Sequence, residues 1–321
     1  MNTRKTINWI AAITGILALV LIFLFIIFRV PDKPLSELKE KYGSKSSRYF
    51  PVQGMSLHFR DEGPATDSLP LVLLHGTGSS LHTWDSMIFQ LEGKRCIRLD
   101  LPGFGLTGPH PLGDYGVENQ CRVIDSLLDF LQVDSCIIMG NSMGGTIAWN
   151  YALHRNAAKG LVLVDAGGFP MTAKGGNIGF TLARTPVVNQ LVKYVTPRSI
   201  VEKSLRQSYG NPQQVPDAVI QRYYDLNLRE GNRQAMIDRF QSVQLLDTSL
   251  IAKISVPVLI LWGEDDQVIP VGNAYRFKKA LPDAILEIYP KLGHVPMEEN
   301  PGRVAESVRH WLTVVRPASV E

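Results

Sequence analysis

The chain has 321 residues, of which 45% are hydrophobic and 20% are charged, and its formal net charge is +3. This composition is that of a globular protein with room for one large domain and an insertion. The small net charge, without a cluster of Lys and Arg interleaved with aromatic residues, argues against nucleic acid as a partner.

The N-terminus has a short basic stretch, residues 1–6, followed by an uncharged run at residues 7–28 that reads INWIAAITGILALVLIFLFIIF. Its length matches the roughly 20 residues that a helix needs to span the hydrocarbon core of a bilayer. The run continues directly into residues 29–31 without the small-residue cleavage site of a signal peptide. We therefore expect residues 7–28 to be an uncleaved transmembrane anchor.

Residues 29–48 are expected to form a solvated, partly charged tether between this anchor and the folded domain. Basic residues lie on both sides of the anchor, at Arg4, Lys5, Arg29, Lys33, Lys39 and Lys41. Large domains translocate largely regardless of such charges, and a short basic N-terminus before the first span commonly stays inside. We therefore expect a single-pass membrane protein with its folded domain on the exported side.

The rest of the chain predicts an α/β fold. Residues 49–60 are typical of an opening antiparallel pair of strands. Apolar runs then alternate with amphipathic stretches such as 118–133 and 303–315, a pattern typical of a mostly parallel sheet flanked by helices. The six further strands are expected at 69–76, 95–101, 135–142, 160–168, 256–264 and 284–290.

Residues 169–248 break this alternation, because they contain amphipathic segments and prolines but no clear strand. We expect them to form a helical cap, inserted between the two parts of the core at 49–168 and 249–316. Ligands of an open α/β sheet bind outside the carboxyl ends of its strands. The cap is therefore expected to lie over the site described next.

The segment Gly140-Asn141-Ser142-Met143-Gly144 matches the pattern G-x-S-x-G between a predicted strand and a predicted helix. A serine on such a sharp turn needs small neighbours because the backbone is strained there. The N-terminus of the following helix favours negative charge that develops beside the serine. Ser142 is therefore the candidate nucleophile, although a glycine-rich turn of this kind is more often purely structural when it stands alone.

A second segment, His75-Gly76-Thr77-Gly78, follows an earlier strand at the place where an oxyanion-hole donor is needed. We assign the oxyanion hole to the backbone N–H groups of Thr77 and Met143. His75, Gly76 and Asn141 are expected to support these loops rather than to react.

The motifs HGTG at 75–78, DLPGFG at 100–105, GNSMGG at 140–145, WGEDD at 262–266 with Pro270, and LGHVP at 292–296 occur in this order. In this respect residues 50–315 resemble the α/β-hydrolase superfamily, which implies the α/β-hydrolase fold and a triad in the chain order Ser, acid, His. The anchor followed by GNSMGG and a cap also resembles the membrane-anchored monoacylglycerol-lipase-like and esterase branch.

Chain order leaves His294 and His310 as candidates for the general base. His294 follows a glycine in a loop after a predicted strand, whereas His310 is mid-helix, so His294 is preferred. For the acid, Asp266 has the spacing G-x-x-D-x-x-x-P that the resemblance implies. Asp165, at the end of an earlier strand, remains the main rival, and Asp265 is expected to be a turn residue.

These residues predict a serine hydrolase that cleaves a carboxylic ester, such as a lipid or monoacylglycerol, through an acyl-enzyme. A carbon–carbon bond hydrolase of the same fold is an alternative, although the resemblance would then imply a Trp soon after His294, where Val295, Pro296 and Met297 stand. An inactive membrane-bound binding module is the other alternative. No CxxC or HxxxH pair occurs, so we expect no metal; we also expect no cofactor and infer no obligate protein partner.

Overall fold

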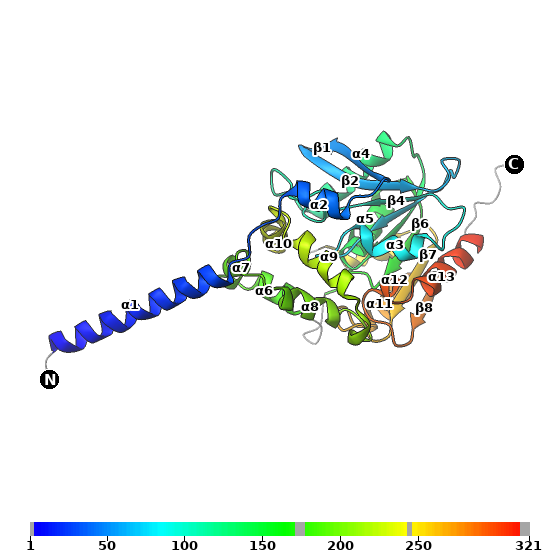
Figure 1. Ribbon diagram of the computed structural model, residues 1–321. Coiled ribbons are helices and arrows are strands. Elements are labelled where there is room, and N and C mark those ends of the chain that lie inside the picture. The colour runs from blue at the N-terminus through cyan, green and yellow to red at the C-terminus, as the bar shows by residue number, and fades with distance from the viewer. Residues whose placement is uncertain (1–2, 171–176, 243–245, 315–321) are drawn as a thin grey trace.

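The fold is built around one sheet of eight strands in the order β1-β2-β4-β3-β5-β6-β7-β8 (Figure 1). The structure is a computed structural model, and it describes residues 3–170, 177–242 and 246–314. β1 (Ser47–Val52) and β2 (Met55–Glu62) form the predicted antiparallel pair. β2 then joins β4 in antiparallel fashion, and every later neighbour is parallel.

The predicted mostly parallel sheet is confirmed. Its other strands are β3 (Leu71–Leu74), β4 (Cys96–Leu99), β5 (Cys136–Asn141), β6 (Ala158–Val164), β7 (Val258–Gly263) and β8 (Ile285–Tyr289). Each is shorter than the apolar run that predicted it, since the ends of these runs belong to loops. Those loops at the carboxyl ends carry the candidate site.

Helices cover both faces of the sheet. In β3, Val72 and Leu74 pack into one hydrophobic cluster, whereas Leu71 and Leu73 pack into another on the opposite face. The first cluster contains side chains of α4 (Val117–Phe130), α5 (Met143–His154) and α11 (Gly272–Ala280). The second contains side chains of α3 (Asp85–Ile88), α12 (Pro296–Glu299) and α13 (Pro301–Val314). Burial on both faces explains why the inner strands β3 and β7 are apolar throughout.

The segment between β6 and β7 is helical in its described residues. It contains α6 (Ile178–Arg184), α7 (Val188–Val192), α8 (Arg198–Gln207), α9 (Asp217–Asn227) and α10 (Asn232–Gln241). Pro197 and Pro216 stand immediately before α8 and α9 with extended backbone, because proline disfavours helix in the residue before it and is tolerated at a helix start. Short 3₁₀ turns lie at Leu81–Trp84, Pro212–Gln214 and Thr248–Lys253.

The N-terminal segment forms one helix, α1 (Thr3–Phe28), which extends away from the rest of the molecule (Figure 1). Within the described residues, no helix combines the length and the hydropathy that crossing a membrane requires. The predicted span over residues 7–28 is therefore not confirmed, and some of its side chains lie outside the described residues.

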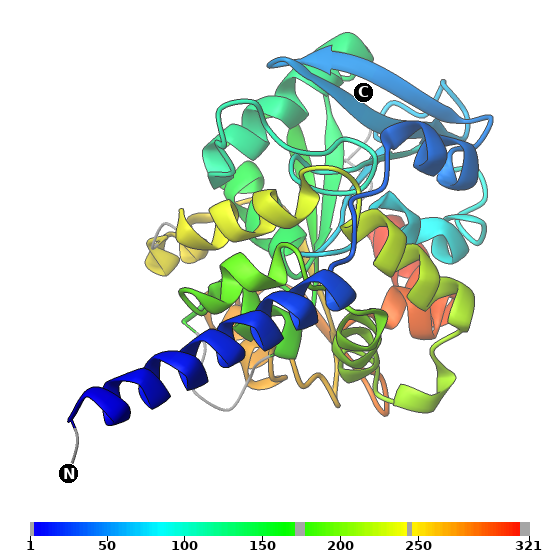
Figure 2. The same ribbon diagram turned by 60° about the vertical axis from the view of Figure 1, so that its left-hand side comes forward.

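The expected solvated tether instead packs against the cap. Val30 N donates to Tyr194 O (2.8 Å), and Lys33 N donates to Leu228 O (2.7 Å). At the end of α2 (Leu35–Tyr42), the side chains of Lys41 and Tyr42 donate to Asp225 Oδ2 of α9 at 2.7 and 2.6 Å. The charges of this segment are thus partly neutralised by residues almost two hundred positions away, which local sequence patterns do not reveal. Figure 2 shows the segment running from α1 across the cap to α2.

Candidate functional site

Ser142 lies on the sharp turn between β5 and α5. Its backbone has φ 55° and ψ −116°, a conformation that residues other than glycine rarely adopt. A Cβ atom at Gly140 would lie 2.1 Å from Gly144 O, and one at Gly144 would lie 2.3 Å from Leu74 O. Both positions therefore require glycine. The turn presents Ser142 at the N-terminus of α5, whose N–H groups favour an anion there.

His294 lies in the loop after β8 and is hydrogen-bonded to Asp266, which lies in the loop after β7. His294 Nδ1 donates to Asp266 Oδ2 at 2.7 Å, and both side chains are buried. Asp266 Oδ1 accepts from the backbone N–H groups of Val268 (2.7 Å) and Ile269 (3.0 Å). The carboxylate is thus fixed on one side and holds the imidazole on the other. This hydrogen bond places the ring proton on Nδ1 and leaves Nε2 free to accept a proton.

Asn141 connects the nucleophile turn to the histidine loop. Its Nδ2 donates to His294 O (2.9 Å) and to Val164 O (3.1 Å). Since Asn141 directly precedes Ser142, its hydrogen bond to His294 O holds the backbone of the candidate base beside the backbone of the candidate nucleophile. Three loops that are far apart in the chain therefore meet at one edge of the sheet.

The rival acids have different positions. Asp165, after β6, is fully buried, and its Oδ1 accepts from Gly263 N at 2.9 Å. Atoms of Asp165, Asp266 and His294 lie within 4.8 Å of one another. Burial first, and then the neighbouring Asp266, raise the pKa of Asp165 well above its usual value. This shift favours the neutral form of Asp165, and the hydrogen bond of the His294 ring goes to Asp266 instead. Asp265 is exposed, as is His310 on α13.

The loop after β3 lies tightly against the nucleophile. A Cβ atom at Gly76 would lie 2.9 Å from Asn141 Oδ1 and 3.0 Å from Ser142 Cβ. His75 is buried; it donates from Nδ1 to Gly76 O (2.8 Å) and accepts at Nε2 from Leu101 N (3.0 Å). Burial lowers the pKa of His75, so the ring stays neutral. His75 thus holds the loop that presents Thr77.

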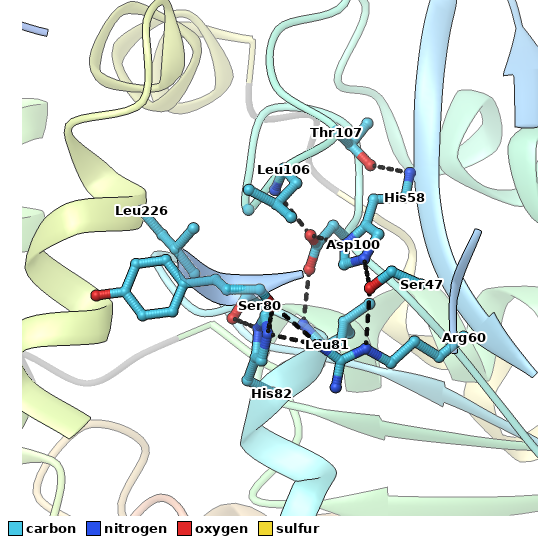
Figure 3. A network of polar contacts seen from close by, with 12 residues as sticks. Ser47, His58, Arg60, Ser80, Leu81, His82, Asp100, Leu106, Thr107 and Leu226 are labelled. Carbon is cyan, nitrogen blue, oxygen red and sulfur yellow. Dashed lines mark hydrogen bonds and ion pairs between the residues drawn. The ribbon is translucent and has the colours of Figure 1, made fainter. Parts of the chain in front are cut away.

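A second buried network supports the same loop (Figure 3). His58 donates from Nδ1 to Asp100 Oδ2 (2.7 Å), and its Nε2 lies 2.8 Å from Ser47 Oγ. Asp100 also accepts from the backbone N–H groups of Leu81 and Leu106, each at 2.8 Å. Although Ser47, His58 and Asp100 have the residue types of a triad, Asp100 is saturated by backbone donors that tie neighbouring loops together. The network therefore positions loops.

Asp100→Asn is expected to destabilise the fold by about 3 kcal/mol, because a buried charge-assisted pair is broken and an amide donor is set against backbone donors. Burial alone would raise the pKa of Asp100, but His58 outweighs this and holds it well below its usual value. The difference in free energy of unfolding between wild type and Asp100→Asn should therefore be largest at neutral pH and should diminish as the pH falls below about 4. Urea unfolding at pH 7 and pH 3 measures it. Asp134→Asn, at an exposed position, is the control, and an equal loss there would contradict the assignment.

Two cavities meet near Ser142. The first, the catalytic cavity, has a volume of about 290 Å³ and is lined by Ser142, Met143 and Thr77 together with cap residues including Phe180 and Arg239. The second, the cap cavity, has a volume of about 100 Å³ and lies among α6 to α10, with mainly apolar walls such as Leu182, Val201 and Ile237. Both cavities include Thr77 and Phe180 in their walls. A molecule bound at Ser142 can therefore extend an apolar part towards the cap.

Two side chains near the site have contacts that the sequence motifs did not predict. Asp100 belongs to DLPGFG, which supported the resemblance without indicating a role for the side chain. Arg239 of α10 donates to Thr77 Oγ1, and nothing in the local sequence distinguishes it from a surface arginine. Only the three-dimensional structure reveals the contacts of both residues, because their partners come from distant segments of the chain.

The model of a family described as alpha/beta hydrolase fold matches residues 70–301. Among curated relatives, Lipase 1 of Psychrobacter immobilis is 28% identical over 259 residues, covering 77% of each chain. The 2-hydroxy-6-oxo-6-(2'-aminophenyl)hexa-2,4-dienoic acid hydrolase of Metapseudomonas resinovorans is 25% identical over 277 residues, covering 83% of this chain and 90% of its own. Among solved structures, a bacterial membrane phospholipase A has a TM-score of 0.71 at 26% identity, covering 98% of this chain and 100% of its own.

Proposed function

Because this chain belongs to the alpha/beta hydrolase fold family, and therefore to a family of hydrolases, we propose that it is a serine hydrolase that cleaves carboxylic esters. The observation that carries the proposal is the 2.7 Å hydrogen bond between Asp266 and His294, whose loop Asn141 ties to the strained turn at Ser142. A nucleophile, a base and an acid that orients the base form the constellation of acyl transfer.

In the proposed mechanism, Ser142 Oγ attacks the ester carbonyl while His294 Nε2 takes its proton. The negative charge on the carbonyl oxygen is stabilised by the backbone N–H groups of Thr77 and Met143 and by the N-terminus of α5. His294 then protonates the departing alcohol, which leaves an acyl group on Ser142. Water, deprotonated by His294, releases the acid and regenerates the serine. Asp266 keeps the proton on Nδ1 and stabilises the imidazolium.

A lipid ester, such as a monoacylglycerol, is the proposed substrate class. The apolar cap cavity next to Thr77 suits an acyl chain, because burying each methylene contributes about 0.8 kcal/mol. The similarity to Lipase 1 and to the membrane phospholipase A supports the same class. A series of p-nitrophenyl esters and monoacylglycerols of increasing acyl length tests it. A kcat/KM that does not rise with chain length would contradict a lipid substrate.

The similarity to a 2-hydroxy-6-oxo acid hydrolase keeps carbon–carbon bond hydrolysis as the second candidate. Assaying a 2-hydroxy-6-oxo-dienoic acid beside the best ester separates the two reactions. Higher kcat/KM on the dienoic acid would replace the ester proposal. An inactive binding module would hydrolyse neither substrate and would not react with a fluorophosphonate.

We further propose that residues 7–28 hold the enzyme at a membrane with its catalytic domain on the exported side. The run has no charged residue, and α1 exposes large apolar side chains such as Ile13, Ile16 and Leu19. The solved membrane phospholipase A covers nearly the whole chain, including this segment. Protease added outside intact cells should then digest the domain, whereas protection until lysis would contradict the proposed side.

The double variant Ile16→Arg and Leu19→Arg is expected to shift the protein from the membrane fraction to the soluble fraction after an alkaline carbonate wash. Each arginine at the middle of a span costs about 2.5–3.5 kcal/mol on insertion scales. Leu112→Arg, which adds charge at a position 88% exposed, should remain in the membrane fraction. Wild-type protein that is extracted by carbonate would contradict the anchor.

A further inference from the structure

Two arginines of the cap border the catalytic cavity. Arg184 is the last residue of α6, and Arg239 lies near the end of α10, which packs against α6. Their guanidinium carbons lie 4.6 and 5.1 Å from the centroid of the same ring, that of Phe240. Arg184 is exposed at the cavity, whereas Arg239 is half-buried. The two positive charges are therefore close together on the cap side of the cavity that contains Ser142.

Neither guanidinium forms an ion pair with a carboxylate among the described residues. Arg239 donates one hydrogen bond to Thr77 Oγ1. Its Nε is buried and has no hydrogen-bond partner among the described residues. Burial and the neighbouring Arg184 lower the pKa of Arg239 to about 10. It remains charged at neutral pH, so the structure keeps two like charges together at a cost that an anion would offset.

A third group points to the same conclusion. Gln120 of α4 lines this cavity and is only 1% exposed, yet neither its amide oxygen nor its amide nitrogen has a hydrogen-bond partner among the described residues. A buried amide without partners is costly, and a ligand or an ordered water that hydrogen-bonds to it would offset this cost. The cavity at Ser142 thus holds unused donors on both α4 and the cap.

We propose that the ester substrate carries an anionic group, a carboxylate or a phosphate, on its alcohol side, and that Arg184 and Arg239 bind this group while the acyl chain occupies the cap cavity. This inference rests on the proposed esterase function and specifies its substrate. Guanidinium groups bind both anions through paired, charge-assisted hydrogen bonds, so both chemistries fit. The contact of Arg239 with Thr77 places the anion site next to the proposed oxyanion hole, where the ester must lie.

The test compares dodecanoyl esters that differ only in their alcohol, assayed with the full chain in micelles of a non-ionic detergent. Monododecanoylglycerol is paired with dodecanoylglycerol 3-phosphate, and the dodecanoyl ester of 3-hydroxypropionamide with that of 3-hydroxypropionate. Wild-type protein is expected to prefer the anionic member of at least one pair by about tenfold in kcat/KM. Preference in the first pair identifies a phosphate, and preference in the second identifies a carboxylate.

Arg184→Gln and Arg239→Gln should each lower this preference by about tenfold, mainly through KM for the anionic ester. Arg122→Gln, an exposed arginine of α4, should leave the preference as in wild type. Because Arg184 is exposed, its variant answers the question even if Arg239→Gln does not fold.

Equal kcat/KM within both pairs, or a preference that survives both arginine variants, would overturn the anion site while leaving the esterase proposal intact. If none of the four esters is hydrolysed and a fluorophosphonate does not label Ser142, the proposed function itself fails, and the anion site with it.

Discussion

Ser142→Ala is expected to lower kcat for ester hydrolysis by about 10⁶-fold, because without the hydroxyl no acyl-enzyme forms and the remaining groups act on water alone. The measurement is initial rates on the best p-nitrophenyl ester, with the folded state checked by circular dichroism. Ser126→Ala is the matched control, since this exposed serine of α4 donates only to Arg122 O. It should retain wild-type kcat.

A fluorophosphonate probe gives an independent measurement of the same nucleophile. Wild-type protein and Ser126→Ala should be labelled, and peptide mapping should place the label on Ser142. Activity retained by Ser142→Ala, or a label found on another serine such as Ser47, would show that the nucleophile lies elsewhere. Ser47 is the informative alternative because it is hydrogen-bonded to the His58 and Asp100 pair.

The sheet could be predicted from the sequence because its signals are local. Runs such as residues 256–264 are apolar up to their final glutamate, and in the structure alternate residues of β7 pack into clusters on opposite faces. The turn at Ser142 could be predicted for the same reason. The glycines that the strained backbone needs are adjacent to the serine, and the close approach of Gly144 to Leu74 O explains why that position cannot carry a side chain.

Contacts between distant segments could not be predicted in this way. The charges of residues 29–48 suggested a solvated tether, but Lys41 and Tyr42 bind Asp225, which is 184 and 183 positions away. The arginines at the catalytic cavity are similar, because α6 and α10 come together only through the cap. Charge patterns along a chain identify ion pairs one helical turn apart, and they carry no information about partners in other elements.

The sequence does not distinguish Asp165 from Asp266 by position alone, whereas their hydrogen bonds in the structure do. Both residues follow strands whose carboxyl ends meet at the site, and both lie close to His294. Only Asp266 is hydrogen-bonded to the imidazole, and it alone of the pair receives two backbone N–H groups on its other oxygen. Those donors stabilise its charge. Asp165 has one such donor and is fully buried, and its pKa is raised well above the usual value, which favours its neutral form.

Asp266→Asn is accordingly expected to lower kcat by about 10⁴-fold with folding retained, because the amide cannot hold the imidazole in the tautomer that leaves Nε2 free. Asp165→Asn should lose less than about tenfold, since the imidazole is hydrogen-bonded to Asp266 and the amide keeps the shape of the Asp165 carboxyl. Rates on the best ester measure both. Asp265→Asn, at an exposed position, is the control and should match wild type.

Stability distinguishes the two aspartates a second time. A carboxyl whose pKa is raised by folding keeps its proton in the folded state, while the unfolded chain releases it above about pH 4, so wild-type stability should fall as the pH rises through that window. Asp165→Asn removes this dependence, so in urea unfolding its free energy of unfolding should rise relative to that of wild type as the pH increases above about 4. If Asp165→Asn instead abolishes turnover while Asp266→Asn preserves it, the acid belongs to the loop after β6, and the hydrogen bond of His294 to Asp266 serves the fold rather than the reaction.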